Sequence, residues 1–90
     1  MSADTIEITS DNFKQTIDDN PIVLIDYWAE WCGPCRAFGP IFEKAAQEHP
    51  DIAFGKCDTE KQMELASAIK IASIPTLMVF KEGVMVFSQP

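Results

Sequence analysis

The sequence predicts a small α/β domain built on a mixed β-sheet that is flanked by helices. Apolar, β-branched runs alternate with segments of helical periodicity in the order βαβαβαββ. Strands separated by helices favour parallel crossovers, whereas the last two strands are joined by a short turn and favour an antiparallel hairpin. The 90 residues suffice for one domain, which would bury about two-thirds of the surface of its unfolded chain.

The predicted elements follow the changes of hydrophobic periodicity along the chain. Ser10 is a suitable N-cap for the first helix, because a hydroxyl can accept a hydrogen bond from a free backbone N–H. The unbroken apolar run at 22–25 suits a central strand that is buried on both faces. Gly83 suits the turn of the final hairpin, where a positive φ is needed. The expected strands are 5–9, 22–28, 52–57, 76–80 and 84–87, and the expected helices are 11–20, 35–49 and 60–70.

The composition limits the classes of function. Hydrophobic residues make up 47% of the chain, which is ordinary for a globular protein and argues against disorder. Fourteen acidic residues against seven basic ones give a net charge of −7, which disfavours binding to nucleic acid or to anionic membranes. The first residues lack the regions of a secretory signal, and three cysteines do not make an extracellular disulfide framework. We therefore expect a cytoplasmic protein.

The most informative segment is Trp31-Cys32-Gly33-Pro34-Cys35, which follows a predicted strand and opens a predicted helix. One turn of helix places residues i and i+3 on the same face, about 5–6 Å apart, close to the Cα spacing of a disulfide. The loop that such a bond closes is very short, so the bond constrains the unfolded chain little. The pair is therefore interpreted as a dithiol that is reversibly oxidised.

Within this pair, Cys32 is the predicted nucleophile and Cys35 the resolving thiol. Free N–H groups and the dipole at a helix start stabilise a thiolate, so the pKa of Cys32 should lie below that of a free cysteine. Cys35, one turn further on, is expected to be more buried and to attack the mixed disulfide that Cys32 forms with a substrate. Pro34 fits the first helical turn, and Gly33 lets a substrate backbone come close.

Asp26 is the second candidate, because a carboxylate at the end of an apolar strand is expected to be buried and to have a raised pKa. It could act as a general acid/base for Cys35, or it could be a strand-end residue that bonds to a helix terminus. The local sequence leaves both interpretations open. A zinc site made by the three cysteines and His49 is disfavoured, because the chain holds a single Cys-x-x-Cys motif and Cys57 has the pattern of a buried strand residue, so no metal is expected.

The segment 26–36, Asp-Tyr-Trp-Ala-Glu-Trp-Cys-Gly-Pro-Cys-Arg, resembles the active-site segment of the thioredoxin family. Pro40 and the Ile-Pro-Thr sequence at 74–76 follow at the spacing of that family, as do Lys81 and Gly83. The similarity runs from about residue 6 to residue 90, and the full Trp-Cys-Gly-Pro-Cys string with a downstream Ile-Pro-Thr is far more specific than a bare Cys-x-x-Cys.

This resemblance implies a thioredoxin fold and a protein-disulfide reductase that serves electron transport and cell redox homeostasis. Its electrons would come from NADPH through thioredoxin reductase, and the redox-active disulfide would need no bound cofactor. Asp26 would be the general acid/base for Cys35, with Lys56 on the neighbouring strand modulating it. Pro75 would be a cis-proline, the Ile74 backbone would pair with an extended substrate, and Trp31 would form the apolar rim of the same groove.

The end of the chain gives one further expectation. The apolar run at 84–87 should be covered on both faces, yet thioredoxins continue beyond it with a helix for which this sequence has no counterpart. The expected unit is therefore one thioredoxin domain over residues 1–90, shortened at its C-terminus and without the last helix. The alternatives to a reductase are a binding module without redox turnover and a domain that associates with another chain through the uncovered sheet face.

Overall fold

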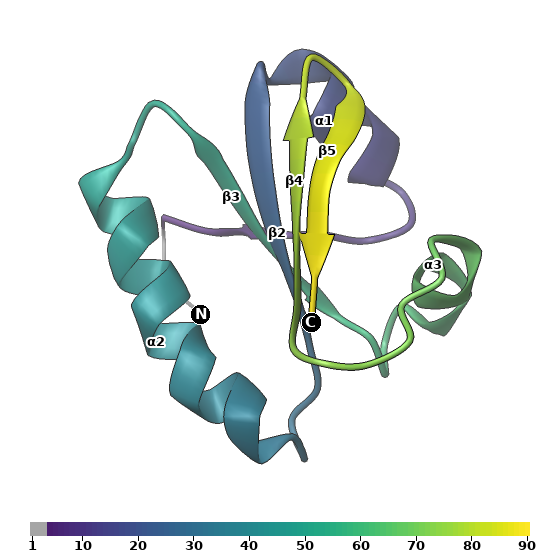
Figure 1. Cartoon of the computed structure of the whole chain (residues 1–90). Coiled ribbons are helices and arrows are strands. Elements are labelled where there is room, and N and C mark those ends of the chain that lie inside the picture. Colours follow the sequence, from purple (N-terminus) through teal and green to yellow (C-terminus); the bar gives the residue numbers. More distant parts are fainter. Residues whose placement is uncertain (1–3) are drawn as a thin grey trace.

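The computed structural model describes residues 4–90 and confirms the predicted alternation of strands and helices (Figure 1). Within those residues no helix is long and apolar enough to span a membrane. In chain order the elements are β1 (Ile6–Glu7), α1 (Phe13–Asp19), β2 (Ile22–Trp28), α2 (Gly33–Glu48), β3 (Ala53–Asp58), α3 (Met63–Ala68), β4 (Thr76–Lys81) and β5 (Val84–Gln89).

The five strands form one mixed sheet in the order β1-β3-β2-β4-β5, with β2 at its centre. β2 runs parallel to β3 and antiparallel to β4. β1 extends the parallel half beside β3, and β5 extends the antiparallel half beside β4. The predicted crossovers and the predicted final hairpin are therefore both present. A central strand that is covered on both faces needs apolar side chains in both directions, which explains the unbroken run at 22–25.

Alternate side chains of β2 point to opposite faces of the sheet. The odd-numbered residues from 23 to 27 are fully buried in the core beneath α1 and α3. The even-numbered residues from 24 to 28 face α2, which lies alone on the other side (Figure 1). There Phe42 of α2 packs edge-on against Phe54 of β3, with ring centroids 5.2 Å apart. The alternation therefore directs Asp26 toward the helix that carries the cysteines.

The first helix begins later than the sequence predicts. Ser10 is not its N-cap, because both the Ser10 N–H and the Ser10 hydroxyl donate to the side-chain oxygen of Gln62. Asn12 takes the cap position instead, and its side-chain oxygen accepts a hydrogen bond from the Thr9 N–H over 2.8 Å. A contact between segments that lie far apart in sequence has replaced the local cap.

The third helix is also shorter than predicted. The carboxylate of Asp58, the last residue of β3, accepts hydrogen bonds from the N–H groups of Glu60 and Lys61. A short Asp side chain that bonds the backbone two and three residues ahead stabilises a turn in place of helix. For that reason α3 begins only at Met63.

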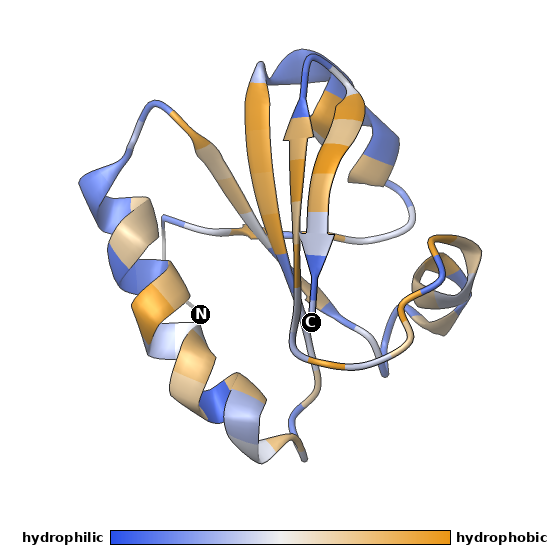
Figure 2. Ribbon diagram, viewed as in Figure 1, coloured by the Kyte–Doolittle hydropathy of each residue, from blue (hydrophilic) through white to orange (hydrophobic). Residues whose placement is uncertain are grey.

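The final hairpin closes through a turn of two residues, Glu82 and Gly83, whose φ angles are 52° and 79°. Two positive φ angles match the twist of the flanking strands, and they explain the glycine. Residues 84–87 are between 44% and 62% exposed, because β5 packs chiefly beside β4 and no described helix packs on its faces. The uncovered sheet face that the sequence predicts is therefore present. Figure 2 shows this apolar strip on the last strand.

Candidate active site

The two cysteines of the motif lie where the chain leaves β2 and α2 begins. Cys32 is the N-cap residue with an extended backbone, and Cys35 lies in the first turn. The Cys35 N–H donates to Cys32 Sγ over 3.2 Å, while Pro34 occupies a position where a missing N–H costs nothing. The two sulfur atoms form a disulfide across a Cα–Cα distance of 5.2 Å. Because the Cys32 sulfur lies at the start of α2 and accepts a hydrogen bond from the Cys35 N–H, it is placed where negative charge is favoured.

The expectation that Cys35 is more buried than Cys32 is wrong for this disulfide form. Each residue is 4% exposed, because the two pack together with Ala29 in one small cluster. Their surroundings differ instead. Cys32 Sγ lies 3.9 Å from the carbonyl oxygen of Ile74, whereas Cys35 lines a cleft between α2 and the sheet. Substrate approach and proton exchange can therefore use different sides of the pair.

The loop that precedes β4 faces Cys32. Its Ile74–Pro75 peptide bond is cis. Trp31, which is 65% exposed, and Ile74 both line a shallow cleft of about 300 Å³ beside the cysteines. A Cβ atom on Gly33 would meet nothing within 4 Å, so the surface there is open. The fold thus gathers Trp31, Gly33 and Ile74 around one side of the disulfide.

Asp26 is completely buried, and neither of its carboxylate oxygens has a hydrogen-bond partner among residues 4–90. The bond to a helix terminus, which the sequence left open, is therefore not formed. Burial raises the pKa of Asp26 to about 6, the positive charge of Lys56 opposes this rise, and the negative charge of Glu43 adds to it. A carboxyl group with such a pKa can both take and release a proton near neutral pH.

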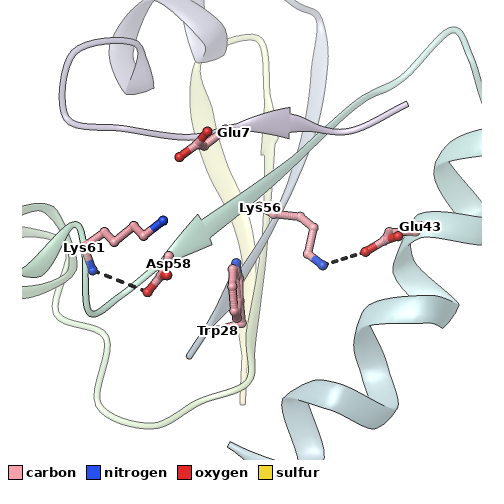
Figure 3. Close-up of a pocket in the computed structure, with 6 residues that line it drawn as sticks. All are labelled: Glu7, Trp28, Glu43, Lys56, Asp58 and Lys61. Atoms are coloured by element: carbon pink, nitrogen blue, oxygen red, sulfur yellow. Dashed lines mark hydrogen bonds and ion pairs between the residues drawn. The ribbon is translucent and has the colours of Figure 1, made fainter. Parts of the chain in front are cut away.

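Lys56 is the residue of β3 that pairs with Asp26 across the sheet. Its ammonium nitrogen lies 2.7 Å from Oε2 of Glu43 on α2 and 5.4 Å from the centre of the Trp28 ring. Figure 3 shows the Lys56 side chain extending toward Glu43 along a cleft of about 320 Å³. Both ion-pair partners are partly screened from solvent, with side chains 14% and 30% exposed.

Sequence reasoning missed Glu43. The available signal is its spacing: it follows Cys35 by eight residues, about two helical turns, and so lies on the sheet-facing side of α2 next to Phe42 and Ala46. A charged residue in that position needs a partner. Lys56, thirteen residues further on, provides it.

The structure keeps the other candidate ligands of a zinc site away from the cysteine pair. His49 caps the far end of α2, about 24 Å from its start for a helix of this length. Cys57 is fully buried in the core on the opposite side of the sheet, and burial raises the pKa of its thiol to about 11. Across residues 4–90 no group of three His, Cys, Asp or Glu side chains is placed to hold a metal ion.

The site and the fold together define a class of protein: a small α/β domain that carries an oxidisable cysteine pair at a helix start. The thioredoxin family model matches residues 4–89. The chain is 63% identical over 86 residues to the Streptomyces coelicolor protein named "Putative thioredoxin 2", an alignment that covers 96% of this chain and 64% of that protein. It is 50% identical over 64 residues to the thioredoxin of Mycoplasma pneumoniae, covering 71% of this chain and 63% of that one. The chain belongs to the thioredoxin family, and it spans somewhat less than two-thirds of the length of these two relatives.

Solved structures agree with this assignment. The thioredoxin of Plasmodium falciparum superposes with a TM-score of 0.89 at 31% identity, covering 94% of this chain and 84% of that one. The oxidised form of mitochondrial thioredoxin 3 from Saccharomyces cerevisiae gives a TM-score of 0.89 at 30% identity, with coverages of 96% and 82%. The thioredoxin fold that the sequence predicts is therefore confirmed.

Proposed function

We propose that this chain is a thiol–disulfide oxidoreductase that reduces protein disulfides through the Cys32/Cys35 dithiol. One observation carries the proposal: Cys32 lies at the start of α2, where its sulfur accepts a hydrogen bond from the Cys35 N–H and lies 3.9 Å from the Ile74 carbonyl oxygen. Membership of the thioredoxin family supports the same reaction class. An inert structural crosslink would gain little from this placement, because the loop it closes is too short to stabilise the fold.

The reaction begins with Cys32 as a thiolate and Cys35 as a thiol. The Cys32 sulfur attacks one sulfur of the substrate disulfide, and the other substrate sulfur leaves as a thiolate that takes a proton from water. Cys35 then transfers its proton to the ionised carboxylate of Asp26 and attacks Cys32 Sγ. The mixed disulfide breaks, and the second substrate thiolate leaves and recovers the proton from Asp26. The substrate has gained two electrons and two protons, and the chain is left with the Cys32–Cys35 disulfide.

The substrate would bind as an extended segment along the loop before β4. The Ile74 carbonyl points to the cysteines and can accept a hydrogen bond from a substrate backbone N–H, in the manner of strand addition. Trp31 would cover one side of the bound segment with apolar surface, and Pro75 would shape the other. The open surface at Gly33 would let the substrate backbone approach the sulfur of Cys32.

The oxidised pair must be returned to the dithiol after each cycle. We assign this step to a thioredoxin reductase that delivers two electrons from NADPH, so that the chain itself holds no cofactor beyond its own disulfide. A reducing cytoplasm is the compartment in which such a cycle would run, and there the chain would serve electron transport and redox homeostasis. A purified reductase with NADPH in place of dithiothreitol tests this assignment directly.

Replacement of Cys35 with serine should trap the chain on its substrate. The variant retains the Cys32 nucleophile but lacks the thiol that resolves the mixed disulfide, so close to one substrate adduct per chain should accumulate. A non-reducing gel or mass spectrum of the reduced variant after mixing with insulin measures the adduct, which dithiothreitol should remove. The matched control, with both cysteines replaced, should form none. Continued turnover of Cys35→Ser at the rate of the unmodified chain would contradict the mechanism.

We propose in addition that two copies of this chain associate through β5. β5 is an edge strand with unpaired backbone groups on its outer side, and its apolar side chains at 84–87 are exposed. Packing of this uncovered sheet face against the same face of a second copy, about a two-fold axis, would bury those side chains. Sedimentation over a wide range of concentrations should detect a dimer that Val86→Lys disrupts and that Met63→Lys, at an exposed apolar residue outside β5, leaves intact. A single monomeric species at every concentration would refute the association.

A further inference from the structure

The Lys56 ammonium does not bind the acidic residue that the sheet register places beside it. Asp26 and Lys56 are Cα partners in the parallel pairing of β2 and β3, so their side chains point to the same face, beneath α2. A lysine beside a buried carboxylate is its natural ion-pair partner. Yet the Lys56 ammonium lies 2.7 Å from Glu43, and both carboxylate oxygens of Asp26 are without a hydrogen-bond partner among the described residues.

Three groups hold the Lys56 ammonium where it is. Glu43 accepts its hydrogen bond, the Trp28 ring lies 5.4 Å away, and the backbone of α2 passes so close that a Cβ atom on Gly39 would lie 3.5 Å from Nζ. The ammonium is attracted both to the carboxylate and to the face of the ring. Figure 3 shows the side chain running toward α2 and away from the strand that carries it.

The position of this ammonium decides how well Asp26 can exchange a proton. If it were released from Glu43, it could approach the Asp26 carboxylate, and an opposite charge within about 4–6 Å would stabilise the ionised form. A carboxylate stabilised in this way is a weak base toward a thiol. While the ammonium is held on Glu43, burial remains the dominant influence on the pKa of Asp26.

We propose that Glu43 is a positioning residue: it holds the Lys56 ammonium away from Asp26, so that the Asp26 carboxyl can take and return the proton of Cys35 near neutral pH. This inference rests on the function proposed above, because only that reaction uses the proton. Among the described residues, the hydrogen bond and ion pair that Glu43 makes are with Lys56 and not with either cysteine. Its effect on the reaction passes entirely through Lys56 and through its own charge.

The charged and titratable groups around Asp26 come from several elements. Cys35 and Glu43 of α2 and Lys56 of β3 line one cleft together with Glu30 and Arg36. On the far side of Lys56, a second cleft is lined by Glu7, Asp58 and Lys61 (Figure 3). Among these groups Glu43 forms the ion pair with Lys56. Glu30 binds Arg36 through its backbone carbonyl. Glu43 is therefore the group whose removal should change the position of Lys56.

The first test measures the titration of Asp26 itself in the oxidised protein, by carbon NMR of its carboxyl group. Glu43→Gln should lower the pKa of Asp26 below its value of about 6, because the negative charge that raises it is removed and the positive charge of Lys56 is then unopposed. Glu43→Asp should restore part of the difference. The matched control Glu48→Gln removes a charge from an exposed site of the same helix and should leave the titration of Asp26 unchanged. An unchanged titration in Glu43→Gln would overturn the inference.

The second test separates positioning from simple charge. Lys56→Met should raise the pKa of Asp26 in both backgrounds, but more in Glu43→Ala than in the otherwise unmodified chain, because Lys56 is free to approach Asp26 only when Glu43 is absent. If Lys56→Met raises the pKa of Asp26 equally in the two backgrounds, Glu43 acts only through its own charge, and the positioning role is overturned. Neither measurement needs turnover, so both can be read even if the chain reduces no insulin. Where insulin is reduced, the acid limb of the pH–rate profile should move to lower pH in Glu43→Gln and stay in place in Glu48→Gln.

Discussion

Replacement of Cys32 with serine is expected to abolish the proposed catalysis of insulin reduction by dithiothreitol, leaving only the rate of dithiothreitol alone. The thiolate is the species that attacks a disulfide, and a serine hydroxyl is not ionised near neutral pH. No other group can replace it in the described part of the chain. Cys35 is turned toward the cleft beneath α2, and Cys57 lies on the opposite side of the sheet. The turbidity of precipitating insulin chains, followed over time, measures the loss.

The control for this experiment is the remaining cysteine. Cys57 is fully buried and burial raises the pKa of its thiol to about 11, so it stays protonated and has no access to a substrate. Cys57→Ala should therefore retain the activity of the unmodified chain. Insulin reduction that persists in Cys32→Ser and disappears in Cys57→Ala would refute the assignment of the nucleophile. Loss of catalysis in both variants would point to a damaged fold, which a circular dichroism spectrum detects.

The parts of the fold that the sequence predicted correctly are those governed by local pattern. The apolar run at 22–25 indicates the central strand, because a strand that is buried on both faces of the sheet needs apolar side chains in both directions. Gly83 was placed in the turn of the final hairpin because a positive φ is needed there, and its φ angle of 79° confirms this. The errors arose where distant segments meet. Ser10 lost its capping role to a contact with Gln62, which lies 52 residues further along the chain.

The candidate site also has parts that follow from local sequence and parts that depend on contacts between distant segments. Cys32 and Cys35 are recognised from five consecutive residues, because one helical turn determines their geometry. The burial of Asp26 follows from the strand in which it lies. The pairing of Lys56 with Glu43 does not follow from any local pattern, because it depends on how α2 crosses β3. A single sequence therefore indicates which groups are candidates to react, while the groups that set their proton affinity become visible only in the packed structure.

Replacement of Asp26 with asparagine is expected to stabilise the protein at neutral and alkaline pH. The pKa of Asp26 is raised from 3.8 to about 6 in the folded state, chiefly by burial. Between these two values the folded state holds a proton that the unfolded state has lost, so the stability of the unmodified chain falls as the pH rises through this window. Above pH 6 the cost is complete and amounts to roughly 3 kcal/mol, since each pKa unit corresponds to about 1.36 kcal/mol.

Urea unfolding of the oxidised proteins, followed by tryptophan fluorescence, measures this difference. At pH 3.5 the Asp26 carboxyl is protonated in the folded state and mostly protonated in the unfolded state, so the variant and the unmodified chain should unfold with similar free energies. At pH 8 the variant should be more stable by roughly 3 kcal/mol. The control Asp51→Asn, at an exposed position, should change the stability by less than about 0.5 kcal/mol at either pH. A variant with no gain at pH 8 would show that Asp26 is not held in a costly ionised form.

The same substitution should slow the chemistry that the carboxylate serves. Asparagine cannot take the proton of Cys35, so resolution of the mixed disulfide should slow by about 100-fold or more if proton transfer limits it. A buried carboxylate that destabilises the fold and accelerates the reaction would be retained for its chemistry, since an amide of the same shape would serve the fold better. A gain in stability together with a loss of rate in Asp26→Asn would therefore show that this residue serves the reaction and not the fold. A variant that gains stability and loses no rate would contradict this role. It would mean that water in the cleft lined by Cys35 accepts the proton of that thiol.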